Sequence, residues 1–149
     1  MLPDDWQEAS SPDEMLSRLG DRFGPRAHLL LGLACCCRIE YLLTDKPLKK
    51  VLRRLKQAAQ EPGPLDEKRQ RDMHNTVCSV FSERFSRLPS PDRRAELYAV
   101  YTLMSATSGQ YTSHLFGNFR AALEHAEGLT LQQVLPMECA FIKQIMRAL

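Results

Sequence analysis

The stretch LLLGLACCCRIEYLLTDKPLKKVLRRLK, residues 29–56, joins an apolar segment with three consecutive cysteines to a strongly basic one. In and just after the basic segment, apolar residues recur at intervals of three and four: Leu48, Val51, Leu52, Leu55, Ala58 and Ala59. This spacing is typical of an amphipathic helix that buries one face. It predicts a helix that begins after Thr44 or Asp45, either of which can cap it, and ends at Glu61-Pro62-Gly63-Pro64.

Helix start and stop signals divide the rest of the chain in the same way. Ser11-Pro12-Asp13-Glu14, Ser90-Pro91 and Thr130-Leu131-Gln132-Gln133 have the form of helix N-termini, and Gly128 is a natural helix stop. The first of the other expected helices begins at Pro12 and ends between Gly20 and Gly24, and the rest cover residues 25–43, 66–87, 91–108, 111–127 and 131–149. No segment alternates apolar and polar residues as a half-buried strand does. We expect an all-α, single-domain bundle of six or seven helices, with one candidate sub-boundary at the turn 61–65.

The charge is unevenly distributed although the chain of 149 residues carries a net charge of only +2. Residues 1–15 hold five acids (Asp4, Asp5, Glu8, Asp13, Glu14) and no base, whereas residues 46–56 hold six bases and no acid. The acidic start lacks the basic region of a secretory signal, and the apolar run 29–37 is too short to cross a bilayer. We therefore expect a cytoplasmic protein without a membrane partner.

The three consecutive cysteines are expected to pack in the protein interior rather than to bind a metal ion or form a disulfide. Successive side chains of a helix point about 100° apart, so Cys35, Cys36 and Cys37 spread over more than half of its circumference. A zinc ion needs thiolates that converge on it, and neighbouring helical cysteines are badly placed for a disulfide. Because the chain has an odd count of five cysteines, we expect reduced thiols packed inside a central helix.

His74 and Cys78 raise a sharper hypothesis, because they lie four residues apart on one face of an expected helix. With two of the clustered cysteines they would form a metal site, and alone they would form a nucleophile and its base. Packing is the more common role of such a pair, and nothing in the sequence supplies an oxyanion hole. We expect no metal and no cofactor, and a metal-dependent or thiol enzyme remains the weaker alternative. The other histidines, His28, His114 and His125, are each isolated in the sequence, so they are weaker candidates for metal ligands.

Six bases lie opposite the apolar stripe of the helix at 46–60: Lys46, Lys49, Lys50, Arg53, Arg54 and Lys56. They would neutralise the phosphates of a nucleic acid, contact an acidic protein, or pair with the acidic N-terminus. No aromatic residue is interleaved with them for stacking on single strands, and no helix-turn-helix or zinc-finger pattern is present. The helix also lacks the Trp or Phe that membrane-surface helices insert.

Catalytic motifs are missing from the sequence: it has no G-x-S-x-G, no P-loop, no dinucleotide-binding glycine pattern and no H-E-x-x-H. We therefore expect a non-catalytic helical protein that binds a macromolecular partner through the six bases. A protein partner is the first hypothesis, in an adaptor, regulatory or immunity-type role. A nucleic-acid-binding subunit is the alternative, and the oligomeric state is left open.

Short motifs follow one another between residues 6 and 60: W-x-x-A, P-x-x-M-L-x-x-L, a basic residue, A-C-C, R-I and L-L-T-D. The residues are Trp6, Ala9, Pro12, Met15, Leu16, Leu19, Arg26, Ala34, Cys35, Cys36, Arg38, Ile39, Leu42, Leu43, Thr44 and Asp45. This order resembles an uncharacterised family of bacterial proteins, present in many copies in some large, GC-rich genomes. Two positions depart from that family, which has arginine where Cys37 stands and an aromatic residue in place of Glu40. The resemblance implies a helical cytoplasmic protein without an established activity, in which Trp6 docks the N-terminus onto the bundle.

Overall fold

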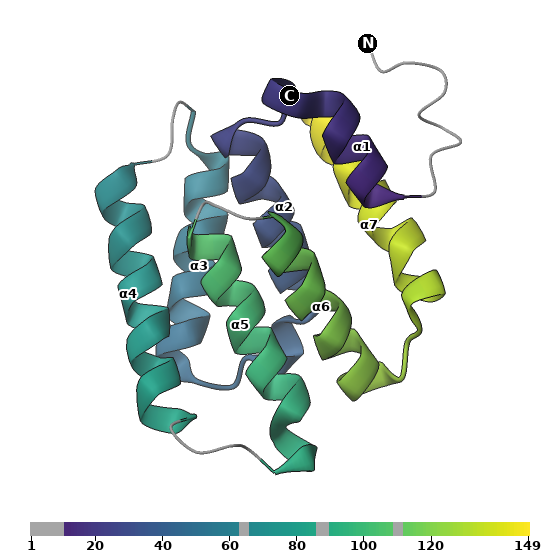
Figure 1. Ribbon diagram of the computed structural model, residues 1–149. Coiled ribbons are helices and arrows are strands. Elements are labelled where there is room, and N and C mark those ends of the chain that lie inside the picture. The colour runs from purple at the N-terminus through teal and green to yellow at the C-terminus, as the bar shows by residue number, and fades with distance from the viewer. Residues whose placement is uncertain (1–10, 63–65, 86–89, 109–111) are drawn as a thin grey trace.

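A computed structural model describes residues 11–62, 66–85, 90–108 and 112–149 (Figure 1). Within these ranges the chain forms seven α-helices and no strand, which confirms the predicted all-α bundle. The helices are α1 (Pro12–Leu19), α2 (Pro25–Arg38), α3 (Lys46–Gln60), α4 (Glu67–Arg84), α5 (Arg94–Ser108), α6 (Thr112–Glu127) and α7 (Leu131–Ala148). Short 3-10 turns lie at Gly20–Arg22, Glu40–Leu42 and Pro91–Arg93. Trp6 and the acids Asp4, Asp5 and Glu8 lie outside the described residues, as does the part of the turn at 63–65.

Helix α2 is the centre of the bundle and packs against α3, α5, α6 and α7 (Figure 1). Helices α5 and α6 lie in front of it in this view, with α4 on one side and the α1–α7 pair on the other. The buried side chains of all seven helices belong to one continuous hydrophobic cluster. Helices α3 and α4, on either side of the predicted sub-boundary, pack against each other within that cluster.

The predicted helix caps account for several of the observed ends. Ser11 Oγ accepts a hydrogen bond from the Glu14 amide at 3.3 Å, and Thr130 with Gln133 forms a capping box at the start of α7. Gly128 ends α6 with a φ of +67°, in the left-handed region that glycine adopts without strain. The Glu14 carboxylate does not complete a second capping box, because it pairs with Arg18 at 2.7 Å.

The predicted helix 25–43 is too long, since α2 ends at Arg38 and a 3-10 turn follows. This turn reverses the chain, so that α3 comes back to pack against α2 while Ile39 and Leu43 are both buried. Asp45 precedes α3 but does not cap it with its side chain. The buried Asp45 carboxylate instead accepts an ion pair from Arg84 at 2.8 Å, which ties the start of α3 to the end of α4.

The cysteine prediction is right for two of the three residues. Cys35 and Cys36 are fully buried, whereas Cys37 is exposed, so the expectation of an interior position for Cys37 is wrong. Each step along a helix turns the side chain by about 100°, and α2 therefore presents one of three successive residues to solvent. Burial raises the pKa of the Cys35 and Cys36 thiols. Both thiols therefore stay protonated and unreactive as nucleophiles.

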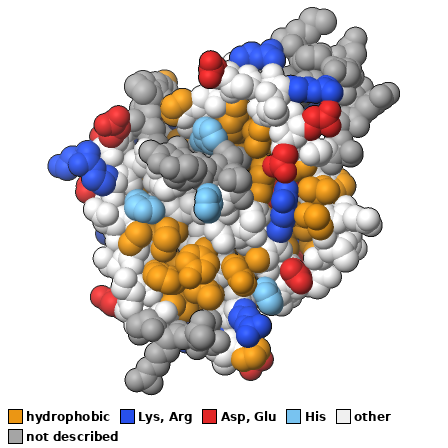
Figure 2. Space-filling view, in the orientation of Figure 1, with side chains coloured by type: hydrophobic (Ala, Val, Ile, Leu, Met, Phe, Trp, Pro, Cys, Tyr) orange, Lys and Arg blue, Asp and Glu red, His pale blue; other side chains and the backbone are white. Residues whose placement is uncertain are grey.

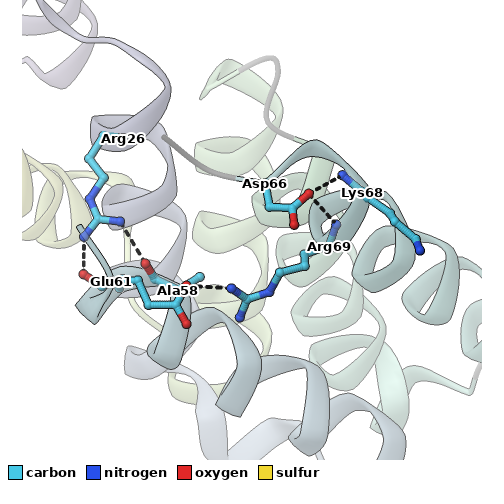
Figure 3. A network of polar contacts seen from close by, with 7 residues as sticks. Arg26, Ala58, Glu61, Asp66, Lys68 and Arg69 are labelled. Carbon is cyan, nitrogen blue, oxygen red and sulfur yellow. Dashed lines mark hydrogen bonds and ion pairs between the residues drawn. The ribbon is translucent and has the colours of Figure 1, made fainter. Parts of the chain in front are cut away.

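Arg26 fixes the position of the α3 C-terminus (Figure 3). Its guanidinium donates to the carbonyl oxygens of Ala58, at 2.8 Å, and of Ala59. These carbonyls have no partner within their own helix because they belong to its last turn. Beyond them, Glu61 pairs with Arg69 at 2.6 Å, so the ends of three helices meet in one polar network.

Candidate partner-binding surface

Five of the six predicted bases form an exposed surface on α3. We call Lys46, Lys49, Lys50, Arg53 and Arg54 the α3 basic face. All five side chains lie opposite the buried stripe of Leu48, Val51, Leu52, Leu55 and Ala58, and none of them makes a hydrogen bond or ion pair within the described part of the chain. The sixth base, Lys56, differs because its ammonium pairs with Glu40 at 3.1 Å and is partly buried.

The local electrostatics of α3 do not favour these cations. A helix N-terminus carries a partial positive charge, so acids stabilise the first turn and bases destabilise it. The first turn of α3 has no acid, and it begins with Lys46. Lys46, Lys49, Lys50, Arg53 and Arg54 also include like-charged pairs three and four residues apart, which repel one another. The repulsion within the set, together with the place of Lys46 in the first turn, therefore costs folding free energy.

Two open hollows flank the α3 basic face and share Lys46 and Arg53. The first has a volume of about 550 Å³ and is lined by Glu40, Tyr41, Leu43, Thr44, Lys46, Lys49 and Arg53. The second has a volume of about 470 Å³ and is lined by Lys46, Pro47, Lys50, Val51, Arg53, Arg54 and Thr76. The cations thus stand on a ridge between two depressions that can receive side chains of a partner.

Tyr41 is a residue of this surface that the sequence did not indicate. Its ring is 57% exposed and lines the first hollow beside Lys46, Lys49 and Arg53. The phenol donates to Glu127 at 2.6 Å, and Arg38 donates to the same carboxylate at 2.7 and 2.8 Å. An aromatic side chain held in a fixed orientation therefore lies beside the bases, although none is interleaved with them along the chain.

Glu127 gives this arrangement a pH dependence. Hydrogen bonds from Arg38 and then Tyr41 lower the pKa of Glu127 to about 2. A carboxyl whose folded pKa is depressed stabilises the fold above its unfolded pKa and ceases to do so as the pH falls through the folded value. We predict that Glu127→Gln lowers the free energy of unfolding at pH 7, and that this deficit disappears between pH 4.5 and about 2. Urea titrations of both proteins at several pH values measure it, and a deficit that does not change with pH would contradict the assignment.

The structure does not bring His74 and Cys78 together with the cysteine cluster. The Cys35 thiol lies near enough to Arg120 and Glu138 for their charges to affect its pKa, whereas His74 contacts Thr107 on α5. Among the described residues no group of three or more His, Cys, Asp or Glu is arranged to hold a metal ion. His28 packs edge-on against Phe23, and His125 stacks on Tyr98.

The acidic N-terminal residues that the structure describes do not neutralise the α3 basic face. Asp13 and Glu14 belong to α1, which packs against α7, and Glu14 pairs with Arg18. Figure 2 shows the face formed by α4, α5 and α6, where hydrophobic side chains gather and Lys and Arg are scattered. On this face the coloured Lys and Arg side chains stand apart from one another rather than in one patch.

Comparisons of the chain with protein-family models, with curated proteins and with solved structures found no match. The resemblance of residues 6–60 to a bacterial family stays a prediction. Among the described helices, none has both the length and the apolar character that a bilayer-spanning segment requires.

Proposed function

We propose that this chain is a non-catalytic adaptor or regulatory protein that binds the acidic surface of a protein partner through the α3 basic face. The observation that carries the proposal is the set of five exposed, like-charged cations without a partner in the described chain, which begins with Lys46 in the first turn of α3. A fold gains nothing from this arrangement, whereas an acidic ligand gains charge-assisted hydrogen bonds to it. Local violations of stability rules of this kind are expected at functional sites.

The surroundings of the α3 basic face suit a protein partner. The two hollows accept side chains on either side of the charged ridge, and Tyr41 supplies a rigid aromatic side chain of the kind that anchors interfaces. Complementary charge steers the encounter and selects against basic partners. The mixed lining of the first hollow, which combines Leu43, Tyr41 and three cations, fits a partner segment with acidic and apolar side chains.

Nucleic acid is the second candidate, and Tyr41 is the observation that favours it. Single-stranded binders place aromatic rings beside a basic groove, and bases stack on those rings. The Tyr41 ring and the cations Lys46, Lys49 and Arg53 line one hollow. The five cations cover only about two turns of helix, so few phosphates would be neutralised and the affinity would be modest.

A titration with defined anionic probes tests the proposal. Fluorescently labelled polyglutamate, single-stranded DNA and RNA, and duplex DNA are titrated with the protein at about 50 and 200 mM salt, because phosphate contacts lose affinity steeply over this range. We expect binding at the lower salt concentration that Lys49→Glu/Arg53→Glu weakens by about tenfold or more. Binding of polyglutamate in preference to the oligonucleotides supports a protein partner, and the reverse order supports the second candidate.

The matched control is Lys68→Glu/Arg71→Glu, which makes the same charge change at two exposed positions of α4. Because Lys68 and Arg71 are not part of either hollow, this variant is expected to bind almost as wild type does. Equal losses in the two variants would show that only net charge matters. That result, or no binding of any probe at the lower salt concentration, contradicts the proposal.

A further inference from the structure

His74, Cys78 and Thr107 form a chain of contacts on the packed faces of α4 and α5. The Cys78 sulfur lies 3.5 Å from His74 Nε2, and His74 Nδ1 lies 3.0 Å from Thr107 Oγ1. Thr107 is fully buried, while His74 and Cys78 are partly exposed. A thiol, an imidazole and an orienting hydroxyl are therefore lined up from the surface to the interior.

The backbone around Thr107 decides which nitrogen of His74 carries the proton. The Thr107 hydroxyl donates to the carbonyls of Leu103 and Met104, both at 3.0 Å, so its single hydrogen is already used. Its oxygen is then left to accept from His74 Nδ1–H. With the proton on Nδ1, Nε2 is the free acceptor that faces the thiol. This is the order that activates a nucleophile: a thiol, a base beside it, and a third group that orients the base.

We propose that Cys78 is a modification site whose thiol His74 activates toward small oxidants of the peroxide class. In the reaction the thiol proton passes to His74 Nε2 and the sulfur attacks one peroxide oxygen. An S–O bond forms and the O–O bond breaks. Sulfur is oxidised by two electrons to a sulfenic acid, and the leaving hydroxide takes the proton to become water.

Small reactants fit this site because the side chains of His74 and Cys78 are each only partly exposed. Within this set of three residues the Thr107 hydroxyl hydrogen and His74 Nδ1–H are already used, so neither is free to stabilise the oxyanion of an acyl substrate. The role is therefore modification of the chain itself, and it is independent of the partner proposed for the α3 basic face.

Cys37 is an internal reference for the reactivity of Cys78. Cys37 is the more exposed of the two thiols, and it makes no hydrogen bond to a histidine among the residues that the structure describes. Burial raises the pKa of Cys37, although Lys56 opposes the shift. If exposure alone set the rate of modification, Cys37 would react faster than Cys78. If His74 assists as a base, Cys78 reacts faster.

The test measures the modification rate of each cysteine by peptide mass spectrometry on the folded, full-length chain. Iodoacetamide at pH 7 is the first reagent, and hydrogen peroxide followed by dimedone, which traps sulfenic acid, is the second. We expect Cys78 to react about tenfold faster than Cys37 with both reagents, since general-base assistance is worth at least that much. Equal rates, or a faster Cys37, overturn the proposal.

Separate variants test the role of His74 as the base and the role of Thr107 in orienting it. His74→Gln is expected to slow Cys78 to about the rate of Cys37, a loss of about tenfold, whereas His125→Gln leaves the rate unchanged. Thr107→Val removes the acceptor of Nδ1–H and is expected to slow Cys78 several-fold, while Thr107→Ser retains the hydroxyl and the wild-type rate. Circular dichroism confirms the fold of each variant. A Cys78 rate that is the same in Thr107→Val and Thr107→Ser contradicts the orienting role even if His74→Gln does not fold.

Discussion

Arg120→Met is expected to lower the free energy of unfolding by about 3–5 kcal/mol, because it leaves a buried carboxylate without its partner. The Glu138 side chain is fully buried, and Arg120 donates to both of its oxygens at distances of 2.7 to 3.0 Å. These contacts join α6 to α7 next to the Cys35 thiol. Urea unfolding at pH 7 measures the loss.

The loss in Arg120→Met also has a predictable pH dependence. Burial raises the pKa of Glu138, and Arg120 opposes this shift without cancelling it. A carboxyl with a raised folded pKa destabilises the fold when it ionises, so stability is regained as the pH falls below the folded value. The deficit of Arg120→Met is therefore expected to shrink as the pH is lowered from 7. The double variant Arg120→Met/Glu138→Met removes both charges and is expected to recover most of the stability. A single-variant loss below about 1 kcal/mol would show that Glu138 is not held as described.

Gly32→Leu is expected to have the second large effect, because Gly32 on α2 packs directly against Ala106 on α5. A Cβ atom on Gly32 would lie 2.8 Å from Ala106 Cβ and 3.1 Å from Ala106 Cα. Even Gly32→Ala must push the two helices apart, and overpacking of this kind costs about 1–3 kcal/mol. The larger leucine side chain is expected to cost more than alanine and to prevent the native packing of α2 on α5. Thermal and urea unfolding measure both variants.

The chain supplies a matched control for Gly32 in α6. Gly117 is exposed within that helix, and a Cβ atom there would meet nothing within 4 Å. Gly117→Ala is therefore expected to stabilise the protein by up to about 1 kcal/mol through helix propensity alone. Changes of opposite sign in the free energy of unfolding of Gly32→Ala and Gly117→Ala support the close packing. Adding Ala106→Gly to Gly32→Ala is expected to restore the lost stability. A stabilising Gly32→Ala would contradict the helix contact.

The helices were predictable because the signals that define them are local. The apolar stripe of α3, the Ser11 and Thr130 caps and the Gly128 stop each depend on residues a few positions apart. The end of α2 was not predictable, because Arg38 to Leu43 remains apolar enough to continue a helix. The turn at Glu40–Leu42 instead packs against α5, which is a tertiary contact. For the same reason, nothing in the sequence revealed that Cys37 faces solvent or that Asp45 binds Arg84.

The candidate surface was predictable in its charge but not in its shape. The helical period places the bases opposite the buried stripe, and within the described ranges Lys56 alone of the six pairs with an acid. Tyr41 reaches the same hollow from outside the helix, and its orientation depends on Glu127, 86 positions away. Thr107, which orients His74, is likewise 33 positions away on α5. Contacts of this kind depend on tertiary packing and leave no local pattern.

The central claim is that the cations of the α3 basic face do not stabilise the folded state. The most direct test is the free energy of unfolding of Lys49→Glu/Arg53→Glu at low salt. Relief of the like-charge repulsion on α3 predicts a value equal to or above that of wild type, together with the loss of anionic-probe binding. A decrease of more than about 1 kcal/mol, the size of an exposed ion pair, would show that these side chains hold the structure together and would contradict a partner-binding role.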